Sequence, residues 1–155
     1  LSTIIIGTNN EIINPLYHGE ISAINEYFHS NINNKIQPTD CIFLSTHEPC
    51  SLCLSAITWS GFDNIYYFFP YNQTKELFNI PHDINILKEI FKLDNGDYNR
   101  INSYWRSYSI IDEIRKLNDS EEYNFENNIK KIYQEYGKLS KLYQENKDKN
   151  LIPLN

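Results

Sequence analysis

Methionine is absent from this chain of 155 residues, and only three cysteines occur. Two of these cysteines form a Cys-x-x-Cys pair, a spacing that in a reducing compartment favours metal binding or redox chemistry over a disulfide framework. No apolar run approaches the roughly 20 residues that a membrane-spanning helix requires, and no secretory signal is visible. We therefore expect a cytoplasmic protein without a membrane segment.

Clusters of lysine and arginine are missing as well. The net charge is −6, and residues 1–119 carry 14 acidic against 8 basic side chains, whereas residues 120–155 carry 6 of each. A sequence-independent grip on a phosphate backbone needs clustered positive charge. The composition therefore argues against nucleic acid as a partner.

Apolar side chains, by contrast, are plentiful enough for a core. Hydrophobic residues make up 41% of the chain and aromatic residues 14%, which suits one folded domain of 18.4 kDa. The chain begins at Leu1 inside an apolar run and contains no methionine. We therefore expect it to be part of a longer product or to lack its start.

The first half of the chain alternates between strand and helix patterns. Short buried strands are predicted at Ile4–Ile6, Cys41–Leu44 and Ile65–Phe69 because these runs are apolar, β-branched or aromatic and end at turn residues. Helices are predicted from about His18 and over Cys50–Ser60, since their apolar residues recur on one face. This order predicts an α/β fold with parallel neighbouring strands and right-handed crossovers.

The second half of the chain is predicted to be helical. We expect helices at Ile84–Leu93 and Tyr104–Leu117, and a long terminal helix at Glu122–Tyr143 whose apolar residues recur at steps of three and four. The terminal helix packs either on its own domain or on another subunit. We accordingly divide the chain into a domain at 1–119 and a helical extension at 120–155.

Two segments carry residues suited to a metal site. His18-Gly19-Glu20 opens the first predicted helix, and Pro49 with Cys50 and Cys53 opens the second. One imidazole and two thiolates suit zinc, and three protein ligands leave one tetrahedral position for water, which is the pattern of a catalytic site. A helix N-terminus favours the thiolate form of a cysteine.

The pattern His-x-Glu followed by Pro-Cys-x-x-Cys resembles the signature of zinc deaminases that act on nucleobases, within the cytidine deaminase-like superfamily. The resemblance implies an α/β/α layered fold with a mostly parallel sheet and helices on both faces, to which the long C-terminal helix adds. It implies Zn²⁺ held by His18, Cys50 and Cys53, and Glu20 as the catalytic group that moves a proton from water to the leaving ammonia. It also implies a homodimer, and a domain that lacks the family's usual N-terminal helix and strand.

The motifs point to more than one substrate. Glu48-Pro49-Cys50, the helix from Cys53 to Trp59 and Leu87-Lys88-Glu89-Ile90 are similar to guanine deaminases or their subgroup, which includes tRNA adenosine deaminases. His18-Gly19-Glu20-Ile21 instead is similar to fungal cytosine deaminase. We favour a free nucleobase or small nucleoside of the guanine type, with cytosine, cytidine or tRNA adenosine as alternatives.

Two further residues are candidates for substrate binding. Gly7-Thr8-Asn9 resembles a family motif whose asparagine hydrogen-bonds the base, although Asn9 also suits a plain turn. Trp59 would either line the pocket or fill the core.

Two other classes of function stay open. A catalytically inactive deaminase fold would serve as a binding module. A structural zinc domain would need a fourth ligand, which His29, His47, His82 or Cys41 could supply. His47 is the strongest rival because it lies three residues before Cys50.

Overall fold

The computed structural model describes the backbone of residues 1–117 and 119–146, and their side chains except those of Asn95 and of residues 119–124. No helix in this part of the chain is both long and apolar enough to cross a membrane. In chain order the elements are α1 (Gly19–His29), η1 (Ile32–Asn34), η2 (Pro38–Asp40), β1 (Phe43–His47), α2 (Ser51–Ser60), β2 (Asn64–Phe69), α3 (Tyr71–Phe78), α4 (His82–Glu89), η3 (Asp94–Gly96), β3 (Arg106–Ser109), α5 (Ile110–Ile114) and α6 (Asp119–Asn146).

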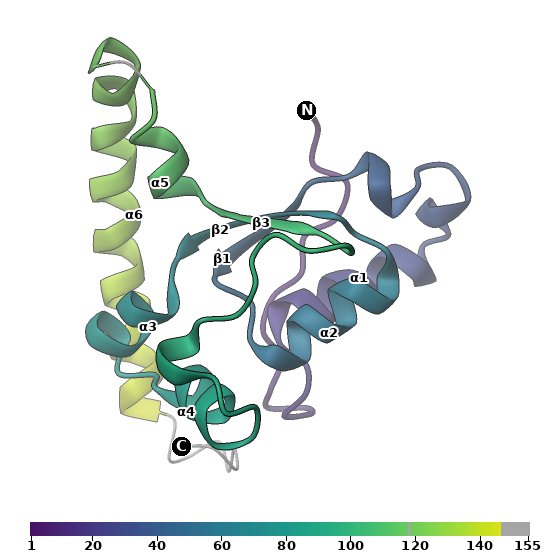
Figure 1. Cartoon of the computed structure of the whole chain (residues 1–155), viewed down its shortest axis with the longest axis horizontal. Coiled ribbons are helices and arrows are strands. Elements are labelled where there is room, and N and C mark those ends of the chain that lie inside the picture. The colour runs from purple at the N-terminus through teal and green to yellow at the C-terminus, as the bar shows by residue number, and fades with distance from the viewer. Residues whose placement is uncertain (118, 147–155) are drawn as a thin grey trace.

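The three strands form one parallel sheet in the order β1-β2-β3. Ile65 at the centre pairs with Phe43 on one side and with Ser107 on the other. All three strands run toward α6, so their carboxyl ends share one edge of the sheet (Figure 1). The predicted α/β class, the parallel sheet and the long C-terminal helix are thus confirmed.

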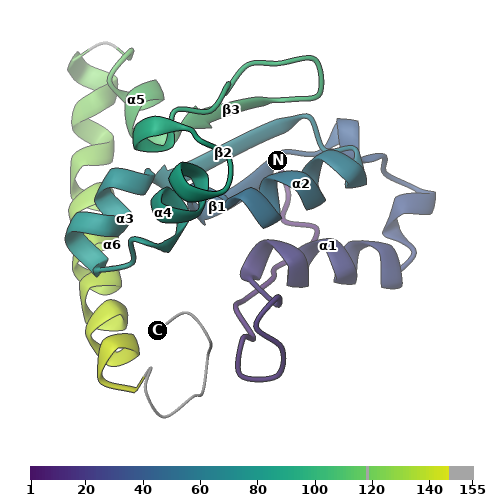
Figure 2. The same cartoon turned by 60° about the horizontal axis from the view of Figure 1, so that its bottom comes forward.

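Helices α1 and α2 lie side by side against one face of the sheet (Figures 1 and 2). Between them and the sheet lies the larger core cluster: Ile24, Tyr27, Phe43, Leu54, Ile57, Phe62, Ile65 and Trp105. Residues alternate between the two faces of a strand, so Phe43 and Ser45 of β1 are buried under the helices whereas Leu44 between them is 66% exposed. This packing holds the N-termini of α1 and α2 at the carboxyl edge of the sheet.

A second core cluster joins α6 to that edge. It consists of Phe68, Phe69, Phe78 and Ile111, against which the α6 side chains Ile129, Ile132, Tyr133 and Tyr136 pack. The terminal helix therefore packs on its own chain, which was one of the two predicted arrangements. Residues 147–155 of the predicted extension lie outside the described residues.

The predicted strand at Ile4–Ile6 is wrong. The sheet contains β1, β2 and β3, and the backbone hydrogen bonds found near this end of the described chain begin only at Asn10. A strand needs a neighbour for its ladder, and none of the described residues pairs with this segment. Ile5 still packs on the core, while Ile6 is 79% exposed.

The predicted helix at Tyr104–Leu117 is confirmed only at α5 (Ile110–Ile114), and its first part is wrong because Arg106–Ser109 forms β3. The residues of β3 that face the core are Ser107 and Ser109, whose small polar side chains hide the apolar alternation that predicts a strand. Pairing with β2, from Asn64↔Arg106 onward, decides the conformation. Helix α3 was not predicted at all.

Candidate metal centre

The imidazole of His18 stands where α1 begins. His18 precedes the helix with an extended backbone (φ −61°, ψ 161°), and Glu20 follows in the first turn. The first turn of a helix leaves its N–H groups without intrahelical partners and carries a partial positive charge. The sequence correctly places both side chains at one helix start.

Both thiols stand at the start of α2. Cys50 is the N-cap residue, and its Sγ accepts a hydrogen bond from the backbone N–H of Cys53 at 3.5 Å. Cys53 follows one turn later and is completely buried. Pro49, the residue just before this N-cap, is buried as well.

The two helix starts bring three metal-binding atoms together. Nδ1 of His18 lies 3.5 Å from Sγ of Cys50 and 3.6 Å from Sγ of Cys53, and the ligand atoms of this set all lie within 4.8 Å of one another. Zinc–ligand bonds of about 2.0–2.3 Å fit inside such a triangle. One imidazole and two thiolates are the donors that zinc prefers, so the residues fit this metal.

The rival fourth ligands stay away from the triangle. The ring of His47 packs on Phe69, Phe78 and Tyr136 at 5.1–5.4 Å between ring centroids. Within the described part of the chain, the only cluster of three or more potential ligands is His18, Cys50 and Cys53. A structural zinc site closed by one of the predicted rivals is therefore not what these residues form.

Glu20 lies beside the triangle without belonging to it. One carboxylate oxygen accepts a hydrogen bond from the Ser45 hydroxyl at 2.6 Å, and the other lies 3.4 Å from Sγ of Cys53. Ser45 thus holds the carboxylate next to one of the three metal-binding atoms. A carboxylate beside a metal can exchange a proton with a water that the metal binds.

The imidazole and the two thiols shift one another's pKa values when no metal is bound. Hydrogen bonds to Cys50 and then to Glu11 raise the pKa of His18 to about 10. Hydrogen bonds from Cys53 and His18 outweigh burial and lower the pKa of Cys50 to about 5. Its hydrogen bond to Cys50, followed by burial, raises the pKa of Cys53. Without a bound metal, these shifts favour a thiolate at Cys50, a thiol at Cys53 and an imidazolium at His18 at neutral pH.

Glu11 is a site residue that sequence reasoning missed. Its carboxylate lies 3.2 Å from Nε2 of His18, on the ring edge away from the thiols. The hydrogen bond from His18, ahead of the opposing effect of burial, lowers the pKa of Glu11. No local pattern marks this residue, because the loop between Asn9 and His18 decides whether its side chain turns inward.

Asp83, in the first turn of α4, is a second missed residue. Burial, with a further contribution from Cys50, raises the pKa of this carboxyl group to about 7. His18 and Glu20 also act on it electrostatically, so it lies close to the metal centre. A lone acid early in a helix looks like a favourable helix-dipole contact in sequence, and only the fold reveals its neighbours.

The two predicted substrate-binding residues lie in different places. Asn9 follows the chain segment that crosses the start of α1, and its side-chain oxygen accepts a hydrogen bond from the backbone of Glu11 at 2.9 Å. Trp59 lies near the end of α2, and its side chain is 91% exposed. The fold therefore brings Asn9 near His18 but does not bring Trp59 to the metal centre of this chain.

The buried carboxylate of Glu48 anchors the loop that carries Cys50. One oxygen accepts hydrogen bonds from Nε of Arg100 at 2.9 Å and from the Tyr98 hydroxyl at 2.8 Å, and the other accepts from the backbone N–H of Tyr71 at 2.9 Å. Tyr71 in turn donates from its hydroxyl to the carbonyl of Pro49. Two separate segments, one at Tyr71 and the other at Tyr98 and Arg100, are thereby fixed to the residues just before Cys50.

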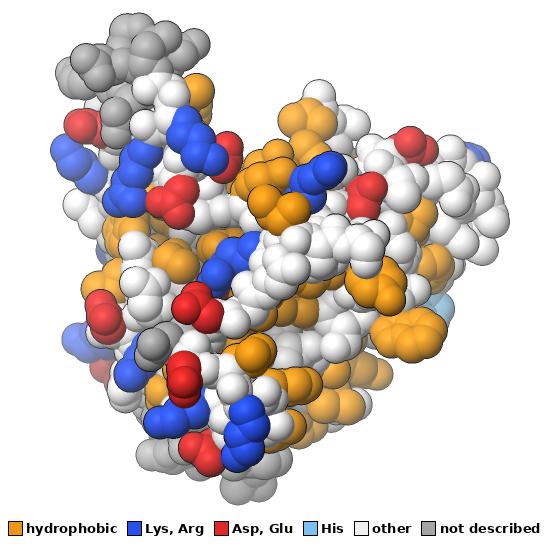
Figure 3. All heavy atoms as spheres, in the orientation of Figure 1, with side chains coloured by type: hydrophobic (Ala, Val, Ile, Leu, Met, Phe, Trp, Pro, Cys, Tyr) orange, Lys and Arg blue, Asp and Glu red, His pale blue; other side chains and the backbone are white. Residues whose placement is uncertain are grey.

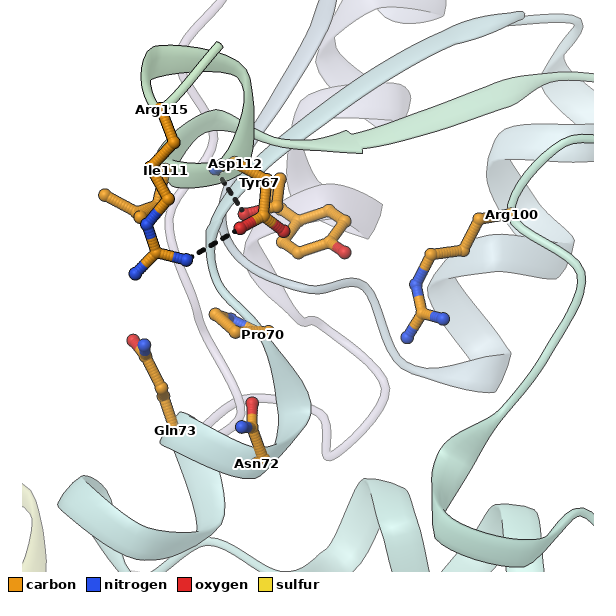
Figure 4. A pocket seen from close by; sticks show the side chains of 9 residues that line it. Tyr67, Pro70, Asn72, Gln73, Arg100, Ile111, Asp112 and Arg115 are labelled. Carbon is orange, nitrogen blue, oxygen red and sulfur yellow. Dashed lines mark hydrogen bonds and ion pairs between the residues drawn. The ribbon is translucent and has the colours of Figure 1, made fainter. Parts of the chain in front are cut away.

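A cavity of about 360 Å³ opens at the carboxyl ends of β2 and β3, and Figure 4 shows Arg100 and Arg115 facing it from opposite sides. Arg100 already pairs with Glu48 at 2.9 Å, and Arg115 pairs with Asp112 at 3.0 Å. The arginines therefore leave no excess positive charge for an anion. None of the three metal-binding residues lines this cavity.

A comparison with known protein families agrees with this geometry. Residues 2–69 match the family described as the cytidine and deoxycytidylate deaminase zinc-binding region. This match supports the resemblance to the cytidine deaminase-like superfamily. The three ligands and Glu20 all lie inside it, so family and donor set both indicate Zn²⁺. No curated protein and no solved structure matches the chain in the corresponding comparisons.

Proposed function

We propose that this protein is a zinc-dependent hydrolytic deaminase of a nucleobase or small nucleoside. The observation that carries the proposal is the triangle of His18, Cys50 and Cys53 with the Glu20 carboxylate 3.4 Å from Sγ of Cys53. When bound there, zinc would supply Lewis-acid activation of a water molecule, whose pKa it lowers toward about 7.

The chain's own residues supply the proton chemistry. Glu20 takes a proton from the attacking water and delivers it to the amino group, which then leaves as ammonia. Ser45 keeps the carboxylate oriented through its 2.6 Å hydrogen bond. The backbone N–H of Cys50, at the start of α2, helps to orient the water. Glu20 is therefore the catalytic residue of the proposal.

The proposed substrate is a purine of the guanine type. Ionised Asp83 offers two acceptor oxygens near the metal centre, and they complement a ring N–H next to the reacting carbon, which guanine has. Cytosine presents a ring nitrogen acceptor at the corresponding place, which the protonated form of Asp83 would complement, and a pKa of about 7 makes both forms of Asp83 available near neutral pH. The carboxamide of Asn9, near His18, would offer a donor and an acceptor to the base. The small-molecule class fits the acidic chain, whose net charge is −6.

Metal analysis and ammonia release from guanine, cytosine, adenosine and cytidine test the proposal. We expect about one zinc ion per chain, and faster ammonia release from guanine than from cytosine, adenosine or cytidine. Glu20→Gln should lower kcat at least about 100-fold, as loss of a general acid–base does, with the zinc content unchanged. Loss of zinc in this variant would make Glu20 a ligand instead. Zinc without activity on any base would support the inactive binding module.

The same proposal includes a cytoplasmic homodimer. Figure 3 shows hydrophobic side chains at the surface over α2, where Trp59 is almost fully exposed and Leu52 partly so. A second copy of the chain would cover such a surface. A reducing compartment would keep Cys50 and Cys53, which are free thiols here, available for the metal.

A further inference from the structure

The two ring nitrogens of His18 face two different chemical environments. Nδ1 faces the thiols of Cys50 and Cys53 at 3.5 and 3.6 Å, whereas Nε2 faces the carboxylate of Glu11 at 3.2 Å. These nitrogens point away from each other across the imidazole ring. A metal bound at Nδ1 is therefore beyond the reach of Glu11, so this carboxylate does not complete the ligand set.

The loop before α1 holds the carboxylate of Glu11 next to Nε2 of His18. The backbone N–H of Glu11 donates to the Asn9 side chain at 2.9 Å, and the N–H of Asn10 donates to the carbonyl of Tyr17 at 2.7 Å. The first bond fixes the backbone of Glu11, and the second closes the loop immediately before His18. The Glu11 side chain is only 15% exposed. Its position is thus built by the loop and does not result from a chance meeting of two mobile surface groups.

We propose that Glu11 is a positioning residue that sets the tautomer and the ring orientation of His18 for metal binding. The inference rests on the proposed metal centre. An ionised carboxylate can only accept hydrogen bonds, so a neutral imidazole keeps its one proton on Nε2 and directs the lone pair of Nδ1 toward the two thiols. Carboxylate partners of metal-binding histidines act in this way and also make the ligand more basic.

Two variants separate the hydrogen bond from the charge of Glu11. Glu11→Gln loses the charge but keeps the reach, because its amide oxygen can still accept the Nε2 proton. Glu11→Asp keeps the charge but is one methylene shorter, so it loses the contact. Glu26→Ala is the matched control, since Glu26 is exposed on α1 and lies away from the ring.

The measurements are Zn²⁺ affinity by competition with a chromophoric chelator and the visible absorption of the Co²⁺-loaded protein. We expect Glu11→Asp and Glu11→Ala to bind Zn²⁺ about 10–100-fold more weakly and to shift the Co²⁺ bands. Glu11→Gln should lose clearly less Zn²⁺ affinity than these two variants. Glu26→Ala should have the Zn²⁺ affinity and the Co²⁺ bands of the parent chain.

Three results would overturn the inference. The first is a Glu11→Ala variant with the affinity and the Co²⁺ spectrum of the parent chain. The second is an equal loss in Glu11→Gln and Glu11→Ala, which would assign the effect to charge alone. In both cases the proposed metal centre stands. The third is a parent chain that binds no metal, which overturns the metal centre together with this inference.

Discussion

Protons compete with the metal at His18 and Cys53. Without metal, His18 has a pKa of about 10 and the pKa of Cys53 is raised, whereas Cys50 is already a thiolate above pH 5 or so. Metal binding needs a neutral imidazole and two thiolates, so at neutral pH it must displace protons from His18 and Cys53.

We therefore predict release of about two protons per zinc ion at neutral pH. Because protons are released, Zn²⁺ affinity rises with pH, by about 100-fold per pH unit for two protons. This slope should hold between the pKa of Cys50, about 5, and that of His18, about 10. Calorimetry in buffers of different ionisation enthalpy measures the protons directly. A pH-independent affinity near neutrality would contradict the assigned protonation states.

A second residue-scale prediction concerns Glu48. Glu48→Ala removes a fully buried carboxylate from Arg100, Tyr98 and Tyr71. Breaking a buried ion pair on one side costs about 3–5 kcal/mol, and the partial exposure of Arg100 should place this case near the lower end. Urea unfolding should show a free energy of unfolding lower by about 3 kcal/mol, and zinc affinity should fall too. Glu89→Ala, at an exposed site on α4, is the control.

At the scale of elements, the starts of α1 and α2 determine the site. Both helices begin directly after a metal ligand, and the cores beneath them keep the two starts together. The extended segment before α1 reaches the same place without sheet hydrogen bonds, so its position depends on side-chain packing and on close contact with α1.

Gly7 makes that close contact possible. A β-carbon on Gly7 would lie 2.4 Å from the Ala23 nitrogen and from the Gly19 carbonyl oxygen. Gly7→Ala should therefore displace the segment, lower the free energy of unfolding by about 1–3 kcal/mol and weaken zinc binding.

Gly137 in α6 is the opposite case and serves as the control. Nothing lies within 4 Å of a β-carbon there, so Gly137→Ala should stabilise the helix by about 0.5–1 kcal/mol. Thermal unfolding and chelator competition measure both variants. Equal effects of the two substitutions would contradict the close contact at Gly7.

At the scale of the whole molecule, the exposed face of α2 predicts self-association. Trp59→Lys should convert a dimer into a monomer, measured as mass by light scattering, because a charge replaces an aromatic side chain that a second copy would bury. Leu44→Lys, on the opposite face of the sheet, should leave the mass unchanged. A parent chain that is already monomeric at all concentrations would rule out the dimer.

Local sequence by itself determined which residues are candidates to bind the metal and that they lie at two helix starts. His18 and Glu20 share one helical turn, and Cys50 and Cys53 share another, so residue spacing along a helix places each pair. Apolar periodicity was likewise sufficient for α1, α2, β2 and the long α6, because each pattern lies within a single element.

Only the tertiary structure decided the rest, because those features depend on contacts between residues far apart in the chain. Strand β3 forms where Arg106 pairs with Asn64, and the segment at Ile4–Ile6 stays unpaired because no described strand lies beside it. Asp83 approaches Cys50 across more than 30 residues, and Glu11 reaches Nε2 of His18 through the shape of a loop. Local spacing carries no information about such contacts, since they form when packed layers and loops bring separate segments together.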